Sequence, residues 1–438
     1  MLKTLYPSFF VILLCPQLLF GQQVLNIVIT QGVDNPVPIA IVPFAWEGFG
    51  VLPENVTDVI GSNLRNSGEF RTIEERNMLS TPHEEREVFY RDWSFLGADY
   101  LLVGKIMRSS GSNLMQVQYE LFDVVRQTRM VGEVISGSES QLRDISHQIS
   151  DVVYEQITGV RGAFATKILY VTSQRRSETD TDYQLNISDA DGGRPQVLLS
   201  SREPIMSPTW SPDASQIAYV SFEDRYPRIY IQDLATGNRE KITEFPGLNS
   251  SPVWSPDGSM MAMVLSMDGN PDIYVMDLRT RELRKVTTHF AIDVEPSWTP
   301  DSKSIIYTSE QGGANRPQIY QVDLETGWTE RVTFQGVYNS KGSLLQDGNN
   351  LIMIHREDTS DSYHLVIQNL ERGTIRFLTD TQLDESPTVA PNASMILYAS
   401  KEGDRGVLNA VSIDGRVKFQ LPVDQGDVRE PAWSPFLD

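Results

Sequence analysis

The phrase Trp-Ser-Pro-Asp decides the fold of this chain, and it begins at Trp210 and again at Trp254. Related phrases, complete or weakened, begin at Trp298, Leu344, Val389 and Trp433. Successive copies start 44, 44, 46, 45 and 44 residues apart. Six copies at a nearly constant period are typical of a repeat protein, in which each unit packs against its neighbours.

Within one period the pattern is that of short strands separated by turns. Residues 261–265, 273–278 and 283–287 are apolar or β-favouring runs with Asp-Gly or polar turns between them. With the strand that carries the phrase, they make a four-stranded unit the size of one propeller blade. The array starts at residues 167–171 without an inner strand, and residues 431–435 supply one at the other end. We therefore predict a six-bladed β-propeller that the C-terminal strand closes, with no open sheet edge.

The residues before the repeats have a different pattern. Pro53 opens a predicted helix that ends near Gly68, and a second predicted helix runs from about Glu139 to Thr158 with Gly159 as its stop signal. Apolar residues at 115, 117, 119 and 121 alternate with polar ones, as in a half-buried strand. We predict a signal peptide over residues 1–21, an α/β domain over residues 22–160 and the propeller over residues 161–438.

The first 21 residues indicate secretion. Lys3 is their only charge, an apolar run follows, and Gly21 is a small residue at the expected cleavage site. The only cysteine, Cys15, lies inside this segment, so the mature chain would contain no thiol. Disulfides, thiolate zinc sites and cysteine nucleophiles are thereby excluded from the mature protein. The predicted location is the periplasm.

Composition and motifs argue against several function classes. The formal charge of −21 disfavours nucleic acids and anionic membrane surfaces as partners, and no direct membrane insertion is expected. No two glycines lie four residues apart, so the nucleophile elbow of serine hydrolases is absent. No phosphate-binding glycine loop exists, and the histidines lack zinc-helix spacing. We predict no enzyme, no cofactor and no metal. The five histidines are His83, His147, His289, His355 and His364.

Six loops precede the predicted inner strands, and propeller geometry brings all of them to one face around the central channel. They combine acids with apolar residues, a composition that fits a protein-binding face as well as a solvated one. The loops are residues 203–206, 247–250, 292–295, 338–341, 384–386 and 428–430.

Four further stretches resemble the TolB family, the periplasmic component of the Tol-Pal system. They are Ile-Val-Ile-Thr-Gln-Gly-Val-Asp at 27–34, Pro-Ile-Ala-Ile-Val-Pro-Phe at 38–44, Leu-Arg-Asn-Ser-Gly-Glu-Phe at 64–70 and Ile-Thr-Gly-Val-Arg-Gly-Ala-Phe at 157–164. The resemblance covers essentially the whole mature chain. It implies a monomeric adaptor that links the outer-membrane lipoprotein Pal to the inner-membrane protein TolA, and that supports outer-membrane invagination at division and envelope integrity.

The resemblance also implies two binding sites. The propeller face would bind Pal, and the mature N-terminal segment would bind TolA. The alternative is a sugar- or peptidoglycan-binding propeller, or an inactive relative of a hydrolase. The predicted Pal-binding residues are Glu203, Met206, Leu248, Asn249, Ser251, Asp293, Val294, Glu295, Glu385 and Arg429; the predicted TolA-binding residues are Gln22, Gln23, Val24, Leu25, Asn26 and Ile27.

Overall fold

The structure is a computed structural model, and the description here covers most of the chain from residue 35 onward. The predicted signal peptide and the predicted TolA-binding residues 22–27 lie outside the described residues. The described ranges are 35–109, 114–178, 180–313, 316–359, 362–381, 383–423 and 426–437.

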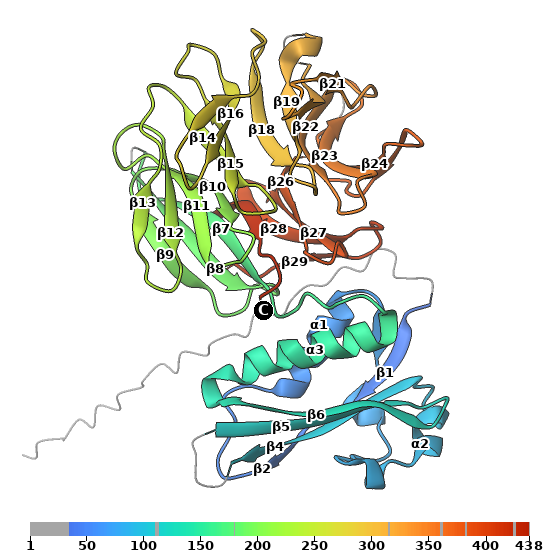
Figure 1. Ribbon diagram of the computed structural model, residues 1–438. Helices are drawn as coiled ribbons and strands as arrows, with labels where there is room; N and C mark the ends of the chain where they lie inside the picture. The colour runs from blue at the N-terminus through green and yellow to red at the C-terminus, as the bar shows by residue number, and fades with distance from the viewer. Residues whose placement is uncertain are drawn as a thin grey trace, which may run out of the picture.

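The first domain is a mixed sheet covered by helices (Figure 1). Its strand order is β3-β1-β4-β5-β6, and β2 pairs with β4 beside this path. The pairs among β1 to β4 are parallel, whereas β4–β5 and β5–β6 are antiparallel. Its elements are β1 (Val37–Ile41), β2 (Ala45–Glu47), α1 (Val56–Asn66), β3 (Phe70–Thr72), η1 (Glu75–Asn77), η2 (Glu85–Glu87), α2 (Tyr90–Phe95), β4 (Tyr100–Arg108), β5 (Leu114–Asp123), β6 (Thr128–Ser138), η3 (Glu139–Gln141) and α3 (Leu142–Thr158).

Both predicted long helices form, and local capping explains where they begin and end. The side chain of Asn55 accepts a hydrogen bond from the Asp58 amide at the start of α1. At the other helix, Ser138 and Gln141 form a capping box around the short turn η3, and α3 begins at Leu142. Gly159 ends α3 in a left-handed conformation with φ of 77°, which favours glycine. The predicted helix start at Glu139 is therefore this short turn rather than α-helix.

The second domain is a ring of six four-stranded antiparallel sheets (Figure 1). We number the blades 1 to 6 in ring order, starting with the sheet that contains β7. The strands are, in blade 1, β30 (Asp427–Trp433), β7 (Lys167–Arg175), β8 (Thr181–Asp189) and β9 (Gln196–Ser201); in blade 2, β10 (Ile205–Trp210), β11 (Gln216–Ser221), β12 (Arg228–Asp233) and β13 (Arg239–Lys241); in blade 3, β14 (Asn249–Trp254), β15 (Met260–Leu265), β16 (Asp272–Asp277) and β17 (Leu283–Lys285); in blade 4, β18 (Asp293–Trp298), β19 (Ser304–Ser309), β20 (Gln318–Asp323) and β21 (Thr329–Arg331), with η4 (Glu310–Gly312) after β19; in blade 5, β22 (Tyr338–Leu344), β23 (Asn350–Arg356), β24 (His364–Asn369) and β25 (Thr374–Phe377); and in blade 6, β26 (Asp384–Val389), β27 (Met395–Glu402), β28 (Arg405–Ser412) and β29 (Lys418–Gln420).

The predicted closure by the C-terminal strand is confirmed. Strand β30 is the inner strand of blade 1 and pairs antiparallel with β7, with Trp433 opposite Ile168. The Ser434 amide donates to the Lys167 carbonyl at 2.9 Å, so the pairing continues past the strand end. The two ends of the array therefore share one sheet.

The repeated Trp-Ser-Pro-Asp phrase fills the core between blades and forms the turn after each inner strand that carries it. Trp210, Trp254 and Trp298 are each at most 7% exposed and pack between blades. The indole N–H of Trp210 donates to the Ala432 carbonyl at 3.0 Å, which joins blade 2 to the closing strand. After Trp210, the Ser211 hydroxyl and the Asp213 carboxylate hold the tight turn. These residues are core and turn chemistry rather than a ligand site.

Helices α1 and α3 lie between the sheet of the first domain and the propeller (Figure 1). The link from α3 to β7 follows the helix closely, because the Asp151 carboxylate accepts the backbone amides of Phe164 at 2.7 Å and Ala165 at 3.1 Å. A Cβ on Gly162 would lie 2.4 Å from the Asp151 Cα, so only glycine fits there. The predicted domain division at residue 160 falls in this link.

Candidate functional site

The candidate site is the propeller face on which the six inner strands begin. Each inner strand runs from this face to the turn that carries the repeated phrase on the opposite face. The opposite face contacts the first domain, since the Asn392 amide donates to the Arg161 carbonyl at 2.9 Å and Arg143 pairs with Asp189. The loops predicted to bind a partner therefore point away from the first domain.

One residue in each inner strand has a positive φ although it is not glycine. Each one lies in a β-bulge, where the register of the inner strand shifts against its neighbour. Such backbone is strained for residues with a side chain, and it turns six side chains toward the central channel. The six residues, with φ between 49° and 55°, are Ser207, Ser251, Glu295, Lys341, Ser386 and Glu430.

This ring of bulges surrounds a cavity of about 250 Å³ and links neighbouring blades through polar contacts. The Lys341 amide donates to Glu295 Oε2 at 3.1 Å, and Lys341 Nζ donates to Ser386 Oγ at 2.6 Å. On the other side of the ring, the Ser207 amide donates to the Glu430 carboxylate. Sequence reasoning singled out Ser251 and Glu295 but missed the ring itself. The signal was present, since Pro follows five of the six residues and Gly342 follows Lys341.

The predicted Pal-binding residues divide into three groups by exposure. Those on the surface are Glu203, Met206, Glu385 and Arg429. Those half-buried are Leu248, Ser251, Val294 and Glu295. Asn249 and Asp293 are both 0% exposed.

The placement of Asn249 and Asp293 corrects the expectation that they belong to the contact surface. Each is the first residue of an inner strand and points inward. Asn249 donates to the carbonyls of Phe245 and Gly247 at 2.8 and 3.1 Å, which holds its own loop. The equivalent Asn339 donates to Gln318 of the preceding blade at 2.8 Å. These residues shape the loops and cannot touch a partner directly.

A repeated spacing could have revealed these inward residues. In blades 2 to 5 a threonine hydroxyl accepts a hydrogen bond from the amide of the second residue of the third strand, at 2.9 to 3.0 Å. A buried Asn or Asp follows each threonine five or six residues later. The pairs are Thr243 and Asn249, Thr287 and Asp293, Thr333 and Asn339, and Thr379 and Asp384.

Burial has an electrostatic consequence at Asp293. It removes the carboxyl group from water, and the nearby Asp272 carboxylate adds repulsion, so the pKa of Asp293 is raised to about 6. The pKa of the equivalent Asp384 is also raised, and burial is again the cause. Neighbouring hydroxyl groups moderate both shifts.

Exposed apolar side chains surround the acidic loops. Met206 is 41% exposed, Ile292 is 42% exposed and Phe290 is 88% exposed. Leu248 and Val294 pack partly into the core between blades 3 and 4. Apolar anchors surrounded by charged residues are the usual composition of a protein-binding surface.

Clusters of side chains that could hold a metal ion are few among the described residues. The one group there with metal-ligand spacing is His147, Asp189 and Asp191 at the domain interface. Cations already occupy these carboxylates, because Arg143 contacts both of them, and Lys167 and Arg194 contact Asp189. The pKa of Asp189 is lowered by this surrounding set of donors despite its burial. The cluster joins the two domains through these ion pairs.

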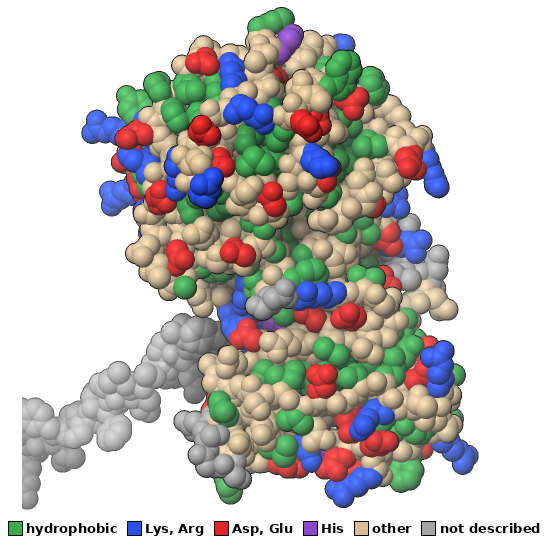
Figure 2. Space-filling view, viewed as in Figure 1, with side chains coloured by type: hydrophobic (Ala, Val, Ile, Leu, Met, Phe, Trp, Pro, Cys, Tyr) green, Lys and Arg blue, Asp and Glu red, His purple; other side chains and the backbone are tan. Residues whose placement is uncertain are grey.

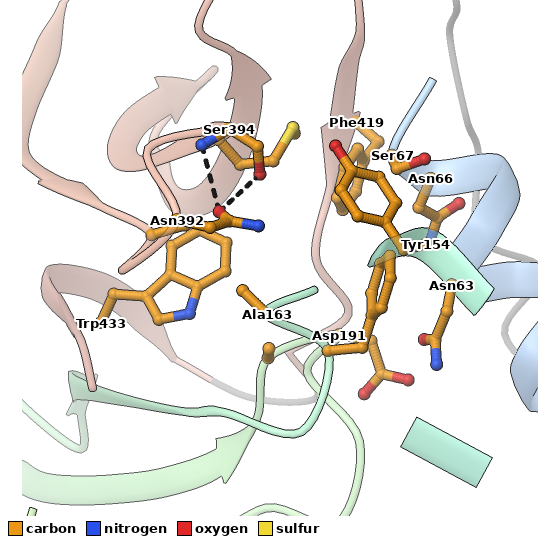
Figure 3. Close-up of a pocket in the computed structure, with 14 residues that line it drawn as sticks. Asn63, Asn66, Ser67, Tyr154, Ala163, Asp191, Asn392, Ser394, Phe419 and Trp433 are labelled. Atoms are coloured by element: carbon orange, nitrogen blue, oxygen red, sulfur yellow. Dashed lines mark hydrogen bonds between the residues drawn. The ribbon is translucent and has the colours of Figure 1, made fainter. Parts of the chain in front are cut away.

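A small apolar cavity of about 50 Å³ lies beside this ionic cluster, between α1, α3 and blades 6 and 1 (Figure 3). Tyr154 and Phe164 line one side with rings 5.6 Å apart, and Trp433 and Ala163 line another.

The charged side chains over the visible surface are of both signs and interspersed (Figure 2).

These features define a class, the two-domain propeller proteins in which a small α/β domain is fixed to one face of a six-bladed ring and the other face is free. Two family descriptions match the chain, "TolB amino-terminal domain" over residues 25–130 and "TolB beta propeller domain" over residues 154–437. The chain belongs to the TolB family, and it is therefore a periplasmic component of the Tol-Pal system.

Individual relatives agree over nearly the full length. The chain is 50% identical to the Tol-Pal system protein TolB of Pseudomonas aeruginosa over 412 aligned residues. The alignment covers 94% of each chain. It is 48% identical to the TolB of Pseudomonas fluorescens over 437 aligned residues, and this alignment covers 100% of each chain. The crystal structure of TolB from Acinetobacter baumannii has a TM-score of 0.85 at 40% identity and covers 94% of this chain and 100% of that one. Among the described residues, no helix has the length and apolar character needed to cross a membrane.

Proposed function

We propose that this chain is the adaptor that links Pal, bound on the free propeller face, to TolA, bound by the N-terminal residues 22–27. Through these two contacts the protein supports outer-membrane invagination at cell division and the integrity of the envelope. It acts as a monomer and catalyses no reaction.

The observation that carries the proposal is the orientation of the propeller. Its loop-bearing face is turned away from the first domain, so a partner there meets no obstruction from the described part of that domain. Met206, Ile292 and Phe290 provide apolar contact area on that face, and Glu203, Glu385 and Arg429 provide charge. A non-enzymatic role is supported by the names of the similar proteins, which are Tol-Pal system proteins.

The test of the Pal contact uses two exposed residues rather than buried ones. Met206→Asp combined with Arg429→Glu should weaken the binding of the Pal periplasmic domain at least about 10-fold in calorimetry, because an apolar anchor and a charge are both changed. Trp328→Asp is the matched control, since Trp328 is 69% exposed on a turn of the opposite face. If only the Trp328→Asp control lost binding, Pal would bind the opposite face and the proposed face would be wrong.

The TolA contact needs a separate measurement. Deletion of residues 22–27 should abolish TolA binding in a pull-down with purified proteins while the thermal unfolding of the rest of the chain is unchanged. TolA binding by the truncated protein would refute the assignment of this segment.

A further inference from the structure

A second cavity opens on the free propeller face, away from the central channel. It lies between blades 4 and 5 and has a volume of about 270 Å³. Ile292, Glu295 and Glu310 line it from blade 4, and Tyr338, Arg356 and Tyr363 line it from blade 5. The volume is below the range of about 300 to 1,000 Å³ that is usual for small-molecule sites. It suits one side chain of a docked protein.

Arg356 uses only part of its hydrogen-bonding capacity in contacts among the described residues. Its Nη1 donates to the Tyr363 hydroxyl at 3.2 Å, and its guanidinium carbon lies 5.0 Å from the centre of the same ring. Its Nε is buried and has no hydrogen-bond partner among the described residues. A guanidinium carries five N–H donors in a planar fork, and a buried donor without a partner is costly. An acceptor from outside would pair with guanidinium donors that Tyr363 leaves unused.

The walls of the cavity select the shape of that acceptor. Tyr338 lies directly opposite Arg356 in the β22–β23 pairing, and its ring meets the Tyr363 ring edge to face at 4.9 Å. Ile292 adds an apolar side chain at 42% exposure. A ligand here needs an apolar stem that packs against the Tyr338–Tyr363 ring pair and an oxygen pair at its tip, which describes an Asp or Glu side chain.

The two acids of the cavity limit how much negative charge can enter. The Glu295 carboxylate already accepts hydrogen bonds from the Thr308 hydroxyl at 2.8 Å and the Lys341 amide at 3.1 Å. Neither Glu295 nor Glu310 forms a salt bridge with Arg356. A second acid beside the first would meet their repulsion, so the cavity favours one carboxylate with neutral or basic neighbours.

We propose that this cavity receives a single acidic side chain of the protein bound on the free face, with its carboxylate paired to the Arg356 fork and its stem packed against the Tyr338–Tyr363 ring pair. The inference rests on the proposed function, because it takes Pal as the protein on that face. Bidentate pairing with arginine would supply orientation as well as affinity.

The experiment compares Arg356→Gln and Arg356→Lys in the full chain by calorimetry against the Pal periplasmic domain. Both variants should weaken binding, by about 10- to 100-fold for Gln, and Lys should restore only part of it because it lacks the planar fork. Arg279→Gln is the matched control, since Arg279 is exposed on the opposite face. Near-ultraviolet circular dichroism checks that each variant folds.

A double-mutant cycle then identifies the acid. Each exposed Asp or Glu of Pal is changed to its amide, and one of them should cost little in the Arg356→Gln background although it costs about 10-fold or more against the unchanged chain. If Pal binds the unchanged chain and Met206→Asp with Arg429→Glu disrupts it, but Arg356→Gln stays within twofold or no acid couples, the cavity proposal is wrong and the adaptor function stands. If Pal does not bind the unchanged chain, both proposals are wrong.

Discussion

At the scale of single residues, Asp293 shows how burial changes the role of a predicted contact. Its carboxyl has a pKa of about 6 in the folded protein, above the 3.8 of a free side chain. Because the folded state holds this proton more tightly, the Asp293 contribution to stability is present below about pH 4 and is lost as the pH rises to about 6 and beyond.

Asp293→Asn should therefore stabilise the protein at neutral pH. We expect the free energy of unfolding at pH 7.5 to rise by as much as about 2 to 3 kcal/mol, at about 1.4 kcal/mol per pKa unit. Blades 3 and 5 already carry Asn249 and Asn339 at this position, so the amide fits the fold. Urea unfolding of both proteins at pH 7.5 and pH 4 checks this. The difference between them should shrink at the lower pH, and a destabilised variant at pH 7.5 would contradict the argument.

At the scale of elements, strand β30 closes the ring, because the repeats begin at β7 without an inner strand and β30 supplies it. Val428 and Ala432 are at most 9% exposed within the cores of two blades, and the indole of Trp433 donates to the Thr166 hydroxyl at 2.8 Å. Without this strand, β7 would present an unpaired edge toward the channel and lose its packing on blades 6 and 2.

Truncation after residue 430 should thus lower the melting temperature by on the order of 10 °C or cause aggregation, because several buried side chains and one strand pairing are lost together. Truncation after residue 436 is the control, since Leu437 is 38% exposed and lies beyond the strand. Scanning calorimetry and light scattering report the two outcomes. Normal melting of the shorter chain would place ring closure elsewhere.

At the scale of the whole molecule, an ionic cluster fixes one domain on the other. Arg143 of α3 contacts Glu54 at 3.3 Å, Asp189 at 3.0 Å and Asp191 at 2.5 Å, and its side chain is only 18% exposed. Arg194 of blade 1 reaches back to Asp144 of α3. Paired charges in such a partly buried place depend on each other, so the loss of one leaves others without compensation.

Arg143→Ala should loosen the domain interface without unfolding either domain. We expect trypsin to cut the link at the exposed Arg161 several-fold faster, because the Arg161 carbonyl is tied to Asn392 of blade 6 and this contact depends on the domains staying together. Arg126→Ala is the control, since its salt bridge with Asp123 lies on the first domain with the Arg126 side chain 79% exposed. Equal cleavage rates in the two variants would show that apolar packing around Tyr154 and Phe164 is sufficient by itself.

The sequence by itself determined the blade number, the strand order within a blade and the closing strand, because these depend on patterns local to each repeat of about 45 residues. It also indicated the two long helices of the first domain, whose ends Asn55, Ser138 and Gly159 fix locally, although it did not indicate α2. Only the tertiary structure decided which loop residues face a partner. Asn249 and Asp293 look like polar surface residues in sequence, yet the start of each inner strand turns them into the protein.

The same holds for the cavity and the domain interface. The cavity combines residues from two blades. Tyr338, Arg356 and Tyr363 lie on separate strands and a loop of blade 5, and their position relative to Ile292 of blade 4 depends on how the two blades pack. Arg143 of the first domain and Asp191 of blade 1 are 48 residues apart. No local pattern marks such pairs, because the energy that brings them together comes from packing the two domains and not from either segment alone.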